Sequence, residues 1–193
     1  IGVSSTYIRG CVDGVSVYAW PAIASYTVMK PSTNLLFTAK FAMDPLATVD
    51  IPGCQYDAPI VNPSTAVNFA LVSCDHQGPF IVTVTVSVGA YYTTGRALYI
   101  YDSIGPILTP LLPANSKVVG NTPLFFTANE DIQSDVTWNA SGCTFGTTAI
   151  TGQTFSATLL NCTSEGTVEL NITTLDTVGN VASHIVSYVY DVT

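Results

Sequence analysis

Hydrophobic and polar residues alternate with a period of two in several short runs of this chain. The clearest runs are residues 82–87 and 168–173. A period of two is typical of a β-strand that packs one face on a core and exposes the other. The inward set that it predicts is aliphatic throughout: Val82, Val84, Val86, Val168, Leu170 and Ile172. No stretch places apolar residues at helical spacing over three turns, so the pattern predicts an all-β protein.

These two runs belong to a sequence repeat with a period of 88 or 89 residues. Phe37-Thr38-Ala39 recurs as Phe126-Thr127-Ala128, and the ending Tyr99-Ile100-Tyr101-Asp102 recurs as Tyr188-Val189-Tyr190-Asp191. Self-similarity at a fixed period indicates a repeated structural unit.

Each unit of about 89 residues consists of short β-branched runs separated by Gly, Pro, Asn and Asp. This length and pattern suit an antiparallel, two-sheet sandwich of the immunoglobulin (Ig) type. One larger barrel or jelly roll is the alternative, but the repeat restarts at Gly105-Pro106, which favours two domains in series. We expect an N-terminal strand at residues 1–12, a first Ig-like sandwich at 13–101 and a second at 102–193.

The composition narrows the possible partners. Five Lys and Arg oppose 13 Asp and Glu, and the net charge of -8 argues against a nucleic-acid partner. Only 9% of residues are charged, and Ser, Thr and Asn supply the polarity, as on surfaces that carry glycans or pack against copies of themselves. No run of 18 apolar residues predicts a membrane-spanning segment, and the absence of a signal-peptide pattern at Ile1 predicts a mature or trimmed chain.

Four of the five cysteines occupy equivalent places in the two repeats. Cys54 and Cys74 correspond to Cys143 and Cys162, so the economical prediction is one disulfide in each unit. A zinc site would require four ligands at closer spacing than this chain offers.

Three N-glycosylation sequons lie in the second repeat, at Asn139, Asn161 and Asn171. Together with paired cysteines they favour an extracellular, cell-surface glycoprotein with N-linked glycans. Chance sequons in a chain rich in Ser, Thr and Asn are the alternative. The alternation of residues 168–173 places Asn171 on the outer face of its strand.

Residues 1–12 belong to neither repeat and correspond in position to the last strand of a preceding unit. The segment is either the end of a cut repeat array, a frayed terminus, or a strand that pairs with a neighbouring copy of the protein. For the third interpretation the candidate intersubunit residues are Val3, Tyr7, Ile8 and Cys11. Cys11 has no partner in the repeat, so it forms an intermolecular bond or serves as a small buried hydrophobic residue.

The sequence contains little that indicates catalysis. His76 and His184 are the only histidines, and no nucleophile elbow, phosphate-binding loop or metalloprotease motif accompanies them. A secreted enzyme would need a carboxylate pair that the sequence does not reveal. We therefore expect no catalytic residues, no cofactor and no enzymatic activity.

Calcium was the best metal candidate that the sequence offers. Glu130, Asp131, Asp135 and Asp176 provide oxygen ligands in the second repeat, with Asp102 between the repeats. The first repeat lacks this acidic group, and solvated acidic turns explain the same residues, so no metal site is predicted.

Three segments of the second repeat resemble a known family. Phe126-Thr127-Ala128-Asn129-Glu130, the segment from Leu175 to Ala182 that contains Asp176-Thr177-Val178-Gly179-Asn180, and the closing Tyr190-Asp191-Val192-Thr193 are similar to prokaryotic Ig-like repeats of extracellular surface proteins. The first repeat matches only through its alignment with the second. A strand ahead of Ig-like sandwiches also resembles, in architecture alone, the subunits of donor-strand filaments such as archaeal thread pili.

These resemblances imply a structural or adhesive function. The function we expect is that of a subunit in a pilus-like, cell-surface filament, a homopolymer in which the N-terminal strand of one copy adds to, or inserts into, the next. The alternative is a stalk or binding module of a surface adhesin with many repeats.

Overall fold

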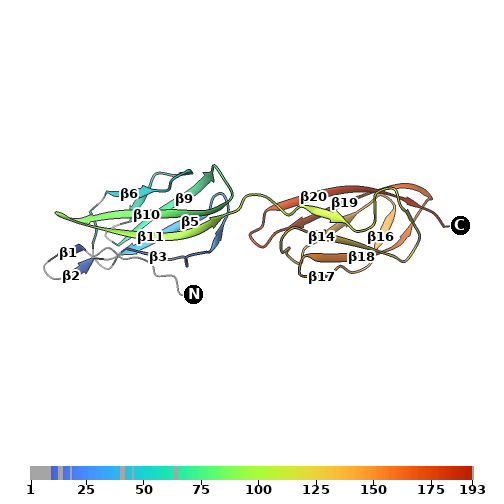
Figure 1. Ribbon diagram of the computed structural model, residues 1–193, viewed down its shortest axis with the longest axis horizontal. Helices are drawn as coiled ribbons and strands as arrows, with labels where there is room; N and C mark the ends of the chain where they lie inside the picture. Colours follow the sequence, from blue (N-terminus) through green and yellow to red (C-terminus); the bar gives the residue numbers. More distant parts are fainter. Residues whose placement is uncertain are drawn as a thin grey trace. The chain divides into compact units, whose positions relative to one another are not determined.

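The computed structural model of the chain is built from β-strands (Figure 1), and it describes residues 10–12, 15–17, 19–39, 42–44, 46–62 and 65–192. The chain forms two compact units, Ile1–Ser103 and Ile104–Thr193, each with its own hydrophobic core. Over the described ranges no helix is long and apolar enough to cross a membrane.

The first unit contains a four-stranded sheet, a five-stranded sheet and a small two-stranded sheet. One sheet has the order β4-β11-β10-β6, and the other has the order β3-β5-β9-β7 with β8 also paired to β9. The strands β1 and β2 form a separate two-stranded sheet. The strands are β1 (Gly10–Val12), β2 (Val15–Val17), β3 (Ala19–Pro21), β4 (Val28–Met29), β5 (Asn34–Ala39), β6 (Ala47–Asp50), β7 (Cys54–Tyr56), β8 (Ile60–Asn62), β9 (Ala66–Cys74), β10 (Gly78–Val88) and β11 (Tyr91–Tyr101).

The second unit repeats this topology. Its sheets have the orders β13-β20-β19-β15 and β12-β14-β18-β16, and β17 pairs with β18. The strands are β12 (Leu108–Pro110), β13 (Lys117–Val118), β14 (Thr122–Ala128), β15 (Thr137–Asn139), β16 (Cys143–Phe145), β17 (Ala149–Thr151), β18 (Thr154–Cys162), β19 (Gly166–Leu175) and β20 (Val181–Tyr190).

Both units are Ig-like sandwiches. In each, the first strand is divided between the two sheets: β3 and β12 pair antiparallel with β5 and β14, whereas β4 and β13 pair parallel with the last strands, β11 and β20. All other pairs within the two sandwiches are antiparallel, as in Ig domains. The all-β, Ig-like fold class predicted from the sequence is confirmed.

The period-two pattern correctly identifies the core-facing residues of the long strands. Val82, Val84 and Val86 of β10 are at most 1% exposed, as are Leu170 and Ile172 of β19. Side chains alternate between the two faces of a strand, and the aliphatic set lies in the core because burial removes it from water.

The hydrophobic run Leu35-Leu36-Phe37 on β5 is not buried throughout. Leu35 and Phe37 are buried, but Leu36 is 37% exposed. β5 is covered on one face only, so a run of three hydrophobic residues cannot be buried completely. Phe125, the residue equivalent to Leu36 in the second unit, is exposed for the same reason.

A buried tyrosine on the last strand recurs in both units. The hydroxyl of Tyr99 donates a hydrogen bond to the carbonyl oxygen of Ile23 (3.1 Å), and that of Tyr188 donates to Leu112 (3.3 Å). Each bond ties the segment between the two halves of the first strand to the last strand. Burial raises the pKa of Tyr99 to about 12 and also raises the pKa of Tyr188.

Raising the pH above 10 is expected to destabilise the protein. The unfolded state loses the Tyr99 proton near the ordinary pKa of 10.0, whereas the folded state keeps it up to about 12. The contribution of Tyr99 to stability is therefore full below pH 10 and falls by about 1.4 kcal/mol per pH unit between 10 and 12. Urea unfolding from pH 8 to 11 measures this slope, and Tyr99→Phe should reduce it. An unchanged slope in Tyr99→Phe would show that Tyr99 does not cause the loss.

Candidate functional site

Each unit contains one disulfide between directly opposed residues of neighbouring strands. Cys54 on β7 is bonded to Cys74 on β9, and Cys143 on β16 is bonded to Cys162 on β18. In the chain-entropy model a loop of this size stabilises a domain by about 3 kcal/mol. In both units the register shifts one residue beyond the cysteine, so even this irregularity is repeated.

Two of the three sequon asparagines lie side by side. Asn139 on β15 is paired directly with Asn171 on β19, so both side chains leave the same face of the sheet. Asn139 is exposed, whereas Asn171 is half-buried and its Oδ1 is buried without a hydrogen-bond partner. The two sequons therefore share one patch of the outer surface.

The third sequon asparagine, Asn161, is exposed and lies on β18, directly before the disulfide-bonded Cys162. Its Oδ1 accepts a hydrogen bond from the hydroxyl of Tyr190 (2.9 Å). A glycan is attached through Nδ2, so this hydrogen bond is compatible with modification.

Asp176 is fully buried and organises the turn between β19 and β20. Its Oδ1 accepts hydrogen bonds from the backbone N–H groups of Val178 (2.8 Å) and Asn180 (2.9 Å). Its Oδ2 accepts one from Nδ2 of Asn180 (2.7 Å). These contacts explain the Asp-Thr-Val-Gly-Asn segment as a turn held by a carboxylate.

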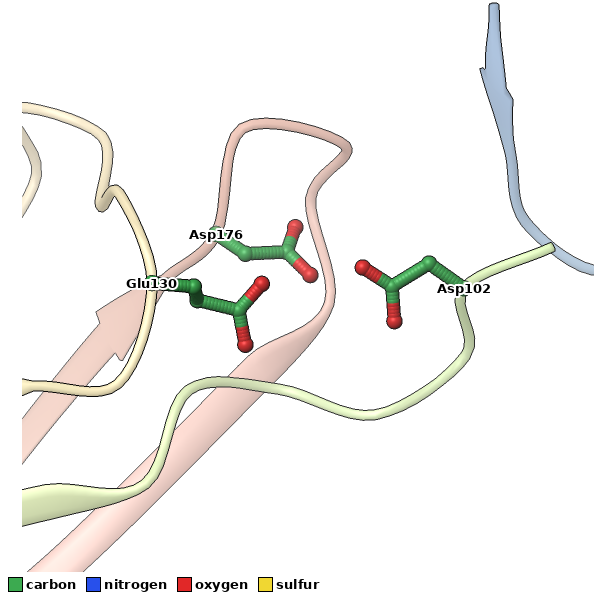
Figure 2. A group of neighbouring side chains, drawn as sticks. All are labelled: Asp102, Glu130 and Asp176. Atoms are coloured by element: carbon green, nitrogen blue, oxygen red, sulfur yellow. The ribbon is translucent and has the colours of Figure 1, made fainter. Parts of the chain in front are cut away.

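Among the acidic residues considered as calcium ligands, Glu130 lies close to Asp176 (Figure 2), with one carboxylate oxygen of each within 4.8 Å. Asp131 and Asp135 are exposed. Asp102, also labelled in Figure 2, belongs to the first unit, where its backbone N–H donates to the carbonyl oxygen of Met29 (2.8 Å). Since Asp176 already accepts three hydrogen bonds, its carboxylate has a structural role without a cation.

The two histidines lie in different environments. His76 is exposed in the turn before β10, and the ring of His184 on β20 packs edge-on against Phe126 with the ring centroids 6.4 Å apart. Within the described ranges neither makes a side-chain hydrogen bond or an ion pair. Nothing in these surroundings indicates a catalytic role.

Of the candidate intersubunit residues, Val3, Tyr7 and Ile8 lie outside the described residues. Cys11 is part of β1, which pairs with β2 in register Cys11↔Ser16. Residues Gly10–Val12 are thus paired within their own chain, and the described strands of the four large sheets lie within residues 19–190.

An incompletely paired strand edge is a feature that the sequence analysis missed. β10 pairs with β11 along its whole length, but with β6 only over Thr83–Val86. Beside the unpaired half lies an apolar pocket of about 400 Å³, lined by Pro52, His76, Pro79, Phe80, Ile81 and Leu98. The run Phe80-Ile81-Val82 was a possible signal, because Ile81 is hydrophobic at an outward position of an alternating strand.

No protein-family model matches the chain, and no curated protein matches it. Solved structures similar to the chain are Ig-like and fibronectin(III)-like modules, including those of a bacterial adhesin. One is the fibronectin(III)-like modules of Clostridium thermocellum CbhA, with 14% identity over 91% of this chain and 93% of that one and a TM-score of 0.37. Two others are from Yersinia pseudotuberculosis. InvD has 13% sequence identity over 92% of this chain and 58% of that one, with a TM-score of 0.36. The adhesin InvE has 11% sequence identity over 89% of this chain and 58% of that one, also with a TM-score of 0.36. At these identities the likeness concerns the fold alone.

Proposed function

We propose that the protein is a structural subunit of an extracellular, cell-surface filament that assembles head to tail by addition of an N-terminal strand to the next copy. The observation that carries this proposal is that the described strands within residues 19–190 already form both Ig-like sandwiches. Residues 1–9 lie outside the described residues, and we assign them to a sheet edge of the next copy.

Completeness of the sandwiches favours addition to a sheet edge over insertion into a sheet. Each unit already has a strand at every position of the Ig-like order, including the divided first strand. An added strand gains main-chain hydrogen bonds from an exposed edge without displacing a resident strand.

Several features support an extracellular location. Disulfides persist in oxidising environments and are rare in the cytosol, and this chain contains one in each unit. Asn139 and Asn161 are exposed, as N-linked glycosylation requires. The low charge of the chain suits a surface that is covered by glycans or by other copies.

A stalk or binding module of a multi-repeat adhesin is the second candidate. The pairing of β1 with β2 within one chain favours it, since these residues are not free for exchange. In that case the protein is a monomer, and the two sandwiches act as spacers or present a ligand surface.

Deletion of residues 1–9 tests the filament function. It leaves β1 and both sandwiches in place, and we expect complete loss of filaments, since the added strand supplies the main-chain contacts between subunits. Negative-stain microscopy and size-exclusion chromatography compare this variant with the full chain, and a variant with residues 1–9 in scrambled order is the matched control. Filaments that persist after the deletion would refute strand addition. A full chain that remains monomeric would refute the filament and favour the adhesin stalk.

A further inference from the structure

The unpaired half of β10 presents backbone groups to its open side. The N–H of Asp44 donates to the carbonyl oxygen of Ser87 (2.8 Å), so the backbone groups of Ser87 point toward the β6 side. Backbone groups of every second residue in a strand point to the same edge, so the N–H and carbonyl of Ile81 and the carbonyl of Pro79 also point toward the β6 side. Pairing with β6 ends at Thr83, and in the part of the chain described here the backbone of Ile81 makes no hydrogen bond on that side.

The apolar pocket beside this edge suits side chains rather than water. Its lining contains one isoleucine, one leucine, one phenylalanine and two prolines, with His76 as the polar residue. Ile81 is 44% exposed on the outer face. An extended peptide that pairs with Ile81 would place alternate side chains over this pocket, the combination that strand addition uses for affinity and specificity.

The equivalent edge of the second unit has a different character. Pairing of β15 with β19 ends at the corresponding residue, Asn171, but Thr167 and Glu169 stand where the first unit has Pro79 and Ile81. A charged residue on a strand edge disfavours pairing. The sequon asparagines Asn139 and Asn171 lie at the margin of this edge, and a glycan there would obstruct it.

We propose that the unpaired edge of β10 around Ile81 is the acceptor site for residues 1–9 of a second copy. This inference rests on the proposed function for the identity of the partner. In an extended conformation Ile1, Val3 and Tyr7 would share one side of the segment, and Ile8 would face the other side. Its one charged side chain is Arg9, and it contains no proline. Nine extended residues span about 30 Å, whereas a ladder of about five residues along the unpaired edge spans roughly 17 Å. The segment is therefore long enough to cover this edge.

Pro79 limits the site to a short ladder. It lacks an N–H group, so the edge offers the carbonyl of Pro79 and both backbone groups of Ile81. Proline at an edge also prevents two β10 strands from pairing with each other, because a continuous ladder is interrupted. The edge therefore suits pairing with a short apolar segment and disfavours pairing with the β10 edge of another copy.

The test measures binding of a labelled peptide of residues 1–9 to the protein that lacks these residues. We expect saturable binding, and Ile81→Glu should weaken it roughly tenfold or more, as truncation of an interface anchor does. The second unit carries Glu169 at the equivalent position, so this side chain is compatible with the fold, and thermal unfolding verifies it. Ile60→Glu is the matched control, since Ile60 is 66% exposed on an edge strand of the other sheet and should leave binding unchanged.

The same variants in the full chain separate the two proposals. Filaments that form without residues 1–9 would refute the proposed function. Filaments that require residues 1–9 but form normally with Ile81→Glu, or peptide binding that Ile81→Glu does not weaken, would refute the acceptor site alone. Absence of peptide binding up to millimolar concentration would also refute the acceptor site.

Discussion

Replacement of Phe126 by alanine is expected to lower the free energy of unfolding of the second unit by about 3–5 kcal/mol. Phe126 is 0% exposed, its ring stacks on Phe155 with the centroids 5.6 Å apart, and it meets Trp138 edge-on at 5.6 Å. Alanine would lose this buried area and leave a cavity that the neighbouring rings, held by the surrounding strands, fill only in part.

Phe125→Ala is the matched control for Phe126→Ala. The two phenylalanines are adjacent on β14, but Phe125 is 43% exposed, so its removal should cost about 1 kcal/mol or less. Urea unfolding followed by tryptophan fluorescence measures both, since Trp138 packs on Phe126 in the core of the second unit. Equal losses in the two variants would contradict the register of β14.

Asp176→Ala is expected to destabilise the second unit by about 3 kcal/mol. The substitution removes the acceptor of three hydrogen bonds and leaves the N–H groups of Val178 and Asn180 without their partner in the turn. Hydrogen bonds to a charged group contribute about 1.5–3 kcal/mol each, and buried donors without an acceptor add a penalty.

Asp176→Asn separates the turn role from a cation-binding role. Its side-chain oxygen still accepts from the two backbone N–H groups, while its amide cannot accept from Nδ2 of Asn180, so we expect about half the loss. Urea unfolding of the wild type and both variants is measured in EDTA and again in calcium. The turn role requires the same losses in both buffers, and stability that depends on calcium only in the wild type would contradict it.

The elements of the candidate sites could be predicted from the sequence to different extents. The four paired cysteines were found because both members of each pair recur at the repeat spacing. The sequons were found from local triplets, but the opposition of Asn139 and Asn171 was not, because these residues are 32 positions apart and meet only through the pairing of β15 with β19. Asp176 was noted as an acidic residue in a turn, whereas its burial and hydrogen bonds depend on how that turn folds back.

The sequence by itself determined the properties that local patterns encode. Alternation in residues 82–87 and 168–173 determined which side chains face the two cores, because successive residues of a strand point to opposite faces. The repeat determined that one Ig-like topology occurs twice. Only the tertiary structure decided that Leu36 and Phe125 are exposed and that Ile81 lies on an unpaired edge. The physical reason is that hydrogen-bond pairing between strands joins residues that are distant in the chain. The edge of β10 stays unpaired beyond the end of β6, and the sequence of β10 alone does not reveal where β6 ends.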